Sequence, residues 1–237
     1  MAAAIAALVV AAAAGLGLTL RNERVAPAPW PESERPELLV LTSLPIVFPE
    51  SFSLDAPASP ALKALQGRYR LRPISLPDRA SLGGGRLLLM AQPRAQPAEV
   101  LVELDQWVRG GGRVLLLADP LLEWPSERPL GDVLRPPLAF ADTGLLGHWG
   151  LRLDSPDKPG PAVIDAGGFR VEARSPGSLV ATGSQCRVEA DGLLARCRIG
   201  KGEATVIADA DLLGPKTREN QEQNLGLVLA ELERIER

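Results

Sequence analysis

The stretch Leu104-Asp-Gln-Trp-Val-Arg-Gly-Gly-Gly-Arg-Val-Leu-Leu-Leu-Ala-Asp-Pro120 contains the end of a predicted helix, three glycines and a predicted buried strand in succession. Apolar residues recur at helical spacing from a start at Pro97 up to the glycines, which end the helix. The apolar run at 113–118 is typical of a strand that is buried on both faces. A helix followed directly by such a strand is the repeating unit of a parallel α/β sheet.

The same pattern recurs on both sides of this stretch. Short apolar runs predict further strands at 37–43, 69–74, 86–91 and 205–208. A short helix is expected between the N-cap Ser59 and Gly67, and the last helix has an apolar stripe that runs from Leu225 to Ile235. Alternating strands and helices predict an α/β fold with a doubly wound, mostly parallel sheet.

Residues 150–200 differ from this pattern, because short alternating runs at 162–165, 169–173 and 179–181 are separated by Gly and Pro. We expect an antiparallel β insertion there. Its clearest hairpin turns at Asp191-Gly192, which places Cys186 opposite Cys197. These two cysteines form either a disulfide or a pair of buried free thiols, and a disulfide would indicate an oxidising compartment.

Residues 2–20 contain no charge and would form a helix about 28 Å long, close to the thickness of a bilayer core. We expect a transmembrane or signal-anchor helix over residues 1–20, with a buried Ala-rich core helix as the alternative. Residues 21–36 are Pro-rich and predict an extended linker, and the α/β domain is expected over residues 37–236. Arg21 and Arg24 would place the body in the cytoplasm by the positive-inside rule, which conflicts with a disulfide.

The composition excludes several classes of function. One His and two Cys are too few for a zinc site, and a net charge of −3 with nine aromatic residues, four Trp, one Tyr and four Phe, argues against a nucleic-acid surface. No Gly-x-Ser-x-Gly or Gly-x-Cys-x-Gly motif presents a nucleophile, and the glycine runs precede strands, unlike phosphate-binding loops. We assign His148 no partner, and expect no cofactor.

Polar side chains gather in the sequence where the predicted parallel strands end, which is where α/β sheets bind ligands. The candidate ligand-binding residues are Thr42, Ser43, Gln92, Asp119, Asp209, Asp211 and Asn224. The alternative is that they satisfy loop backbones and cap helices. Three carboxylates suit Mg²⁺ or Ca²⁺, but the sequence does not fix their spacing, so we predict no metal site.

Three stretches resemble the GldG-like, ABC-transporter-associated domain, which is also described as a class I glutamine amidotransferase-like domain. They are Leu39-Val-Leu-Thr-Ser-Leu-Pro45, the stretch 104–120 quoted above, and Gly200-Lys-Gly-Glu-Ala-Thr-Val-Ile-Ala-Asp-Ala-Asp211 with Asn224-Leu225. The resemblance implies a flavodoxin-like domain outside the bacterial cytoplasmic membrane, held by a single N-terminal helix beside ABC transporter subunits or gliding-type machinery. Amidotransferases use a Cys with His and Glu partners, and no residue here matches them.

These observations predict a membrane-anchored, non-enzymatic binding or scaffolding domain with a periplasmic body. The alternative is a hydrolase or transferase with a carboxylate site that includes Asp119, Asp209 or Asp211. A carbohydrate-binding accessory domain is disfavoured, because the aromatic residues are few and mostly lie at predicted core positions.

Overall fold

The computed structural model describes residues 24–50, 58–215 and 218–237. The helix predicted over residues 1–20 lies outside these ranges. Within them, no helix has the length and apolar character needed to cross a membrane.

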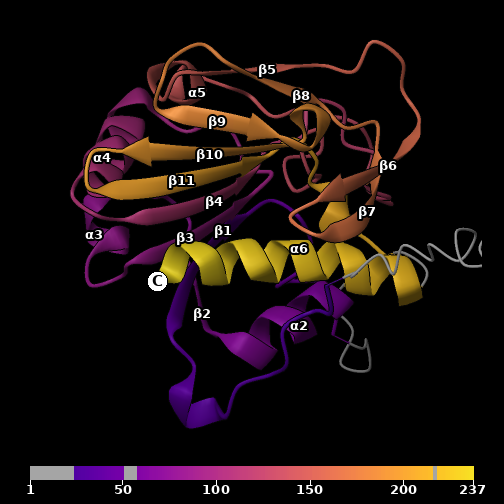
Figure 1. Cartoon of the computed structure of the whole chain (residues 1–237), viewed down its shortest axis with the longest axis horizontal. Helices are drawn as coiled ribbons and strands as arrows, with labels where there is room; N and C mark the ends of the chain where they lie inside the picture. The colour runs from indigo at the N-terminus through magenta and orange to yellow at the C-terminus, as the bar shows by residue number, and fades with distance from the viewer. Residues whose placement is uncertain (1–23, 51–57, 216–217) are drawn as a thin grey trace, which may run out of the picture.

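A seven-stranded sheet forms the centre of the molecule (Figure 1). Its strands are β1 (Glu37–Thr42), β2 (Arg70–Pro73), β3 (Leu87–Ala91), β4 (Arg113–Leu117), β9 (Cys186–Glu189), β10 (Leu194–Ile199) and β11 (Gly202–Ile207). They are ordered β2-β1-β3-β4-β11-β10-β9, and the first five are mutually parallel. The order of these five parallel strands is that of a flavodoxin-like layout. The predicted α/β fold with a mostly parallel sheet is confirmed.

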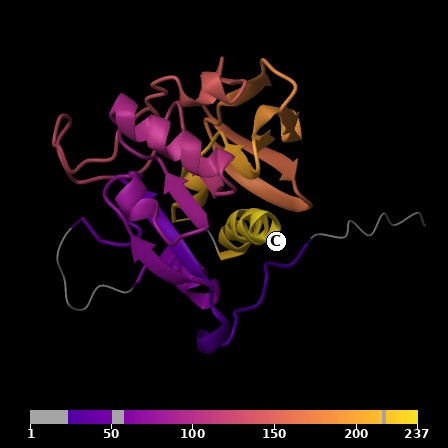
Figure 2. The ribbon, with the colours of Figure 1, turned by 90° about the vertical axis from the view of Figure 1, so that its left-hand side faces the viewer.

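Helices and small sheets cover both faces of the main sheet. The helices are α2 (Pro60–Arg68), α3 (Arg79–Leu82), α4 (Ala98–Arg109), α5 (Leu145–His148) and α6 (Arg218–Glu236), with 3₁₀ turns η1 (Glu32–Glu34), η2 (Ala190–Gly192) and η3 (Asp211–Leu213). One core cluster joins the sheet to α2 and α6, and the other joins it to α3, α4 and α5. Figure 2, a view along α6, shows these layers.

The helix starts follow from local sequence. Ser59 caps α2, because its side chain accepts a hydrogen bond from the backbone N–H of Leu62 (3.0 Å), and Pro60 occupies the first helical position. Trp107 in the last turn of α4 lies against Gly112, where a Cβ would come within 2.3 Å of its ring. The glycines between α4 and β4 therefore let the chain turn directly from helix to strand.

The β insertion has two parts. Two small antiparallel pairs lie outside the main sheet, namely β5 (Leu151–Asp154) with β8 (Ser178–Ala181), and β6 (Pro161–Ala166) with β7 (Phe169–Arg174). The hairpin of β9 and β10, which we expected to belong to the insertion, instead extends the main sheet, because β10 pairs antiparallel with β11.

The register of that hairpin is as the sequence predicts. Cys197 pairs with Cys186 and Ala195 with Val188, and the turn residues Asp191 and Gly192 both have positive φ angles, of 52° and 91°. Positive φ at both positions is the type I′ geometry that Asp-Gly favours. A disulfide joins Cys186 and Cys197, so the free-thiol alternative does not apply.

Residues 24–36 contain only the 3₁₀ turn η1 as regular structure, but they are not a free linker. The backbone N–H of Arg24 donates to the carbonyl of Gly168, and that of Trp30 donates to the carbonyl of Gly67. The segment thus lies against α2 and the β6–β7 turn before it enters β1.

Candidate functional site

A groove lies where β1, β2 and β3 end. It has a volume of about 590 Å³ and is lined by Leu41, Thr42, Ser43, Phe48, Pro73, Ile74, Ser75, Leu76, Arg94, Ala95 and Gln96. A second depression of about 310 Å³ shares Thr42, Ser43, Phe48 and Arg94 with it, and extends to Arg128 and Leu134. Because the strand order reverses between β1 and β3, this is the place at which open α/β sheets bind ligands.

Thr42 and Ser43 are the only two of the seven candidate residues that line these grooves in the described part of the chain. The Thr42 hydroxyl donates to the carbonyl of Ala91 (2.9 Å) and accepts from the N–H of Leu44 (2.9 Å). The Ser43 hydroxyl donates to the carbonyl of Gln92. Both hydroxyls therefore join the end of β1 to the end of β3, and they also contribute polar surface to the groove.

Gln92 directly follows β3 and has a φ of 44°, in the left-handed region that non-glycine residues seldom adopt. Its side chain is completely buried. The amide nitrogen donates to the carbonyls of Asp119 and Pro137 (3.1 Å each), and the amide oxygen accepts from the N–H of Asp119 (2.9 Å). These three hydrogen bonds hold the loop after β4 against the loop after β3.

Asp119, Asp209 and Asp211 come together as one buried cluster at the ends of β4 and β11. Each offers a carboxylate oxygen, and these oxygens lie within 4.8 Å of one another. Asp119 accepts hydrogen bonds from the backbone N–H groups of Leu121 (2.8 Å) and Ala210 (3.0 Å). Parallel pairing of β4 with β11 thus brings the three carboxylates together at one edge of the sheet, and their role in ligand binding stays a prediction.

Burial raises the pKa of Asp119 to about 7, because desolvation penalises the ionised form and the charge of Asp211 adds to it, while the backbone donors only partly compensate. The donor set, carboxylate oxygens alone, is chemically suited to Mg²⁺ or Ca²⁺. Nevertheless both oxygens of Asp119 are directed at backbone amides, and one oxygen each of Asp209 and Asp211 accepts from the N–H of Arg174 and Glu123 (2.7 Å each). Through these hydrogen bonds the three carboxylates hold neighbouring backbone loops in place, which we call the loop-holding role.

Unlike the other candidates, Asn224 lies on an α-helix. It is buried on α6, where its side chain accepts from the N–H of Glu172 and donates to the carbonyl of the same residue (2.9 Å each). The amide therefore acts as a hydrogen-bonding partner for the backbone of β7. Asn224 lines neither strand-end groove in the described part of the chain, because β7, which the sequence does not place beside α6, occupies that side of the helix. A role of Asn224 in ligand binding stays a prediction.

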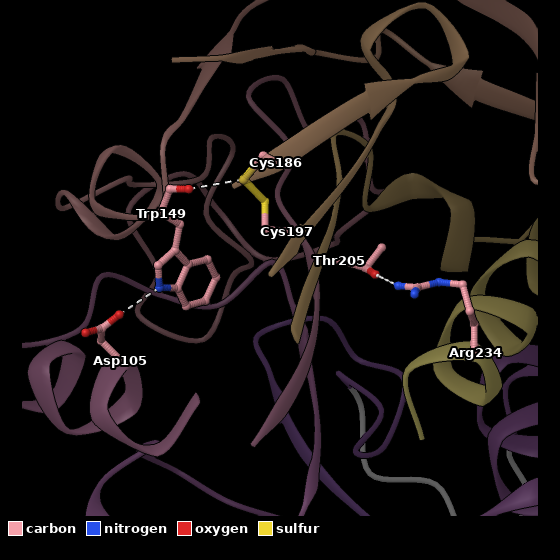
Figure 3. The surroundings of a disulfide bond; sticks show 6 residues. All are labelled: Asp105, Trp149, Cys186, Cys197, Thr205 and Arg234. Carbon is pink, nitrogen blue, oxygen red and sulfur yellow. Dashed lines mark hydrogen bonds between the residues drawn. A yellow bond between two sulfur atoms is a disulfide. The ribbon is translucent and has the colours of Figure 1, made fainter. Parts of the chain in front are cut away.

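A second polar cluster, which sequence reasoning missed, surrounds His148. Its Nε2 lies 3.3 Å from Oδ2 of Asp105 and 3.1 Å from a guanidinium nitrogen of Arg109. Asp105 also accepts from Arg109 Nε (2.7 Å) and from the indole N–H of Trp149 (3.0 Å; Figure 3). His148 therefore has a partner, contrary to our expectation. The helical spacing of Asp105 and Arg109 was the available signal, but nothing in the sequence places α5 beside α4.

This cluster lies at one end of a groove of about 440 Å³ between α4 and α5. Although partial burial opposes ionisation of Asp105, hydrogen bonds from Arg109 and Trp149 and the nearby positive charge outweigh it and lower the pKa of this carboxyl. The disulfide adjoins the cluster, since Cys186 Sγ lies 3.1 Å from the carbonyl oxygen of Trp149 (Figure 3). The hairpin, α5 and α4 are thus linked on one side of the sheet.

A third cluster connects α6 to the opposite side of the sheet. Glu231 accepts from Arg196 on β10 and from Arg234 one turn along the helix, and Arg234 also donates to the hydroxyl of Thr205 (2.6 Å; Figure 3). Burial opposes ionisation of Glu231, but the two guanidinium groups lower its pKa below the ordinary value. This arrangement holds α6 on the sheet.

Several solved structures have a similar fold. An exo-β-1,4-mannosidase from Opitutaceae bacterium strain TAV5 matches 87% of this chain at 15% identity with a TM-score of 0.51. A cytoplasmic protein from Salmonella typhimurium LT2 matches 84% at 13% identity, and the mmIFT52 N-terminal domain 84% at 11%, both with a TM-score of 0.53. This chain covers 99% and 96% of those two, respectively.

This chain spans 36% of the mannosidase, about a third of its length. No family model matches the sequence, and no curated protein matches it. At these identities the likeness concerns the fold alone.

Proposed function

We propose that the chain is a membrane-anchored, non-enzymatic binding or scaffolding domain that acts beside an ABC-type transport system. In this proposal, residues 1–20 are the anchor and residues 37–236 form a flavodoxin-like, amidotransferase-like body in the periplasm. The single observation that carries the non-enzymatic part is the state of Gln92. A strained turn after a parallel strand is where a nucleophile elbow presents its reactive side chain. Here that position holds an amide whose oxygen and nitrogen are bonded to the loops.

The loops at this edge of the sheet also provide a surface for a partner. Large apolar side chains are exposed after β1 and β4, namely Phe48, Leu130, Val133, Leu134 and Leu138, with exposed fractions between 46% and 79%. Phe48 and Leu134 line the same depression, together with Arg94 and Arg128. An exposed apolar group beside guanidinium groups is typical of protein interaction sites.

A photocrosslinking amino acid at Leu134, in the full chain in its native membrane, tests this function. We expect crosslinks to a transporter subunit, identified by mass spectrometry, and none from the same probe at Val102, which is similarly exposed on α4. Crosslinks from Leu134 to no transport component, or equal crosslinking from Val102, would contradict the proposal.

A carboxylate-dependent hydrolase or transferase is the second candidate, favoured by the raised pKa of Asp119, since catalytic acids are often tuned toward neutrality. Against it, Asp119 is fully buried and lines neither strand-end groove in the described part of the chain. Asp119→Ala, Asp209→Ala and Asp211→Ala discriminate the two: loss of a turnover activity with an unchanged melting temperature supports an enzyme, and loss of folding supports the loop-holding role.

A further inference from the structure

The segment before β1 meets the body at a fixed place. The backbone N–H of Arg24 donates to the carbonyl of Gly168 in the β6–β7 turn (3.0 Å). Gly168 has a φ of 90°, and a Cβ there would come within 2.9 Å of Arg24 Cδ. The positive φ favours glycine at this position, and a side chain here would also displace that of Arg24.

Further contacts hold the same segment against the helix layer. The guanidinium of Arg68 lies 4.3 Å from the ring centroid of Trp30, donates to the carbonyl of Ala28 (2.5 Å) and pairs with Glu233 of α6 (3.1 Å). Arg68 is only 5% exposed, so this cation interacts with little competition from water. Residues 24–30 are consequently part of the folded body.

The chain between the proposed anchor and this attachment is short. Four Cα–Cα steps separate Leu20 from Arg24, and they cover at most about 14 Å even when fully extended. The headgroup layer outside the hydrocarbon core takes up roughly 5–7 Å of that reach. A body attached at Arg24 is therefore close enough to the bilayer to touch the headgroups.

The chemistry around the attachment fits such a surface. Arg24 and Arg170 are exposed, Arg237 at the end of α6 is 75% exposed, and the Val25 side chain is 89% exposed. The acidic neighbours include Asp165, which is the cross-strand neighbour of Arg170 in the β6–β7 hairpin, and Glu233, which forms an ion pair with Arg237. Guanidinium groups are well suited to phosphate, and an adjacent apolar side chain can enter the interface.

We propose that the tether face, defined as Arg24, Val25, Gly168, Arg170 and Arg237, lies on the phospholipid headgroups of the membrane that contains residues 2–20. This inference rests on the anchor of the proposed function. It adds an orientation: α6 and the β6–β7 hairpin are toward the bilayer, and α3 and α4, on the other face of the sheet, are away from it (Figure 2).

The test uses the full chain reconstituted in vesicles of phosphatidylcholine and phosphatidylglycerol that contain a headgroup spin-labelled lipid. A fluorescent amino acid is placed at Arg170 or, as a matched control, at Val102 on α4, both of which are exposed. We expect at least about threefold more quenching at 170 than at 102, because the label must approach the headgroups to be quenched. A twelve-residue Gly/Ser insertion between Glu23 and Arg24 should lower quenching at 170 toward the level at 102.

The outcomes separate the orientation from the anchor. Equal quenching at both positions, or more at 102, in a chain that resists alkaline carbonate extraction would overturn the tether face and leave the anchor intact. If quenching at 170 is undiminished after the insertion, the short chain between Leu20 and Arg24 is not what keeps this face at the headgroups, and that part of the proposal is overturned. Release of the chain by carbonate would overturn the anchor, and the tether face with it.

Discussion

Asp119 and Glu231 are both buried carboxylates, 0% and 3% exposed, yet their pKa values move in opposite directions. Asp119 accepts from neutral backbone N–H groups and faces another carboxylate, and its pKa rises to about 7. Glu231 accepts from two guanidinium groups, and its pKa falls below the ordinary value. The difference shows that burial alone does not decide the charge of a carboxyl. What decides it is whether the fold supplies a counter-charge.

The largest loss of stability is expected when the charge of Glu231 is removed. We expect Glu231→Gln to lower the free energy of unfolding by about 3 kcal/mol, because it leaves Arg196 and Arg234 partly buried without their shared partner. Urea denaturation at neutral pH measures this. Glu99→Gln, at an exposed position in the first turn of α4, is the control and should change stability by less than about 0.5 kcal/mol. Similar losses in the two variants would show that the buried network is dispensable.

The raised pKa of Asp119 predicts a particular pH dependence. The folded protein holds this proton more tightly than the unfolded chain, whose carboxyl titrates near 3.8. The stability from this group is therefore complete below pH 3.8 and is lost as the pH rises to about 7. Glu231 acts oppositely: its contribution is present above pH 4.5 and is lost as the pH falls through its lowered pKa.

Asp119→Asn tests this pH dependence. Between pH 5 and 7 the free energy of unfolding of the natural chain should fall by on the order of 2 kcal/mol more than that of the variant. Denaturation curves at a series of pH values measure the slopes. Parallel slopes in the two proteins would mean that Asp119 is ionised across this range.

Asp211→Asn tests how much the charged neighbour of Asp119 affects its pKa. The negative charge of Asp211 is one of the smaller causes of the raised pKa of Asp119, so its removal should lower that pKa. Carbon-13 NMR of the Asp119 carboxyl follows the titration. A midpoint that stays in place or moves upward would rule out the charge of Asp211 as a cause.

The smallest change in stability is expected for His148, whose side chain is exposed, unlike the buried carboxylates discussed above. Its side chain is 61% exposed, and Asp105 keeps its bonds to Arg109 and Trp149 without it. His148→Ala should therefore change the free energy of unfolding by less than about 0.5 kcal/mol. Thermal and urea denaturation both report it. A loss above about 1 kcal/mol would show that His148 has a structural role beyond an exposed ion pair.

The sequence predicts most of what is local in this fold. Apolar runs locate the parallel strands, and the Asp-Gly turn places Cys186 opposite Cys197, because both features depend on residues close together in the chain. The sequence also places Asp119 and Asp209 at the ends of buried parallel strands, but only the pairing of β4 with β11 in the structure brings the two carboxylates together.

The contacts that the sequence did not predict join elements far apart in the chain. Asn224 bonds to β7, and Asp105 to His148, across helices and strands whose relative positions no local pattern specifies. Gln92 was predicted at the correct edge, but its left-handed backbone and its three bonds depend on a loop that follows a different strand. The sequence pattern thus indicates which side chains lie at strand ends, but it does not indicate their hydrogen-bonding partners, which come from distant parts of the chain.

The disulfide has a consequence for how separate copies of this chain behave. β9 is the outer strand at one edge of the main sheet, and an outer strand can leave its own hairpin and pair with another molecule. Because the bridge joins directly paired residues, it fixes the register of β9 on β10 and keeps the strand from being exchanged. Oxidised chains should therefore resist domain swapping and edge-to-edge aggregation, whereas reduced chains at high concentration should be open to both.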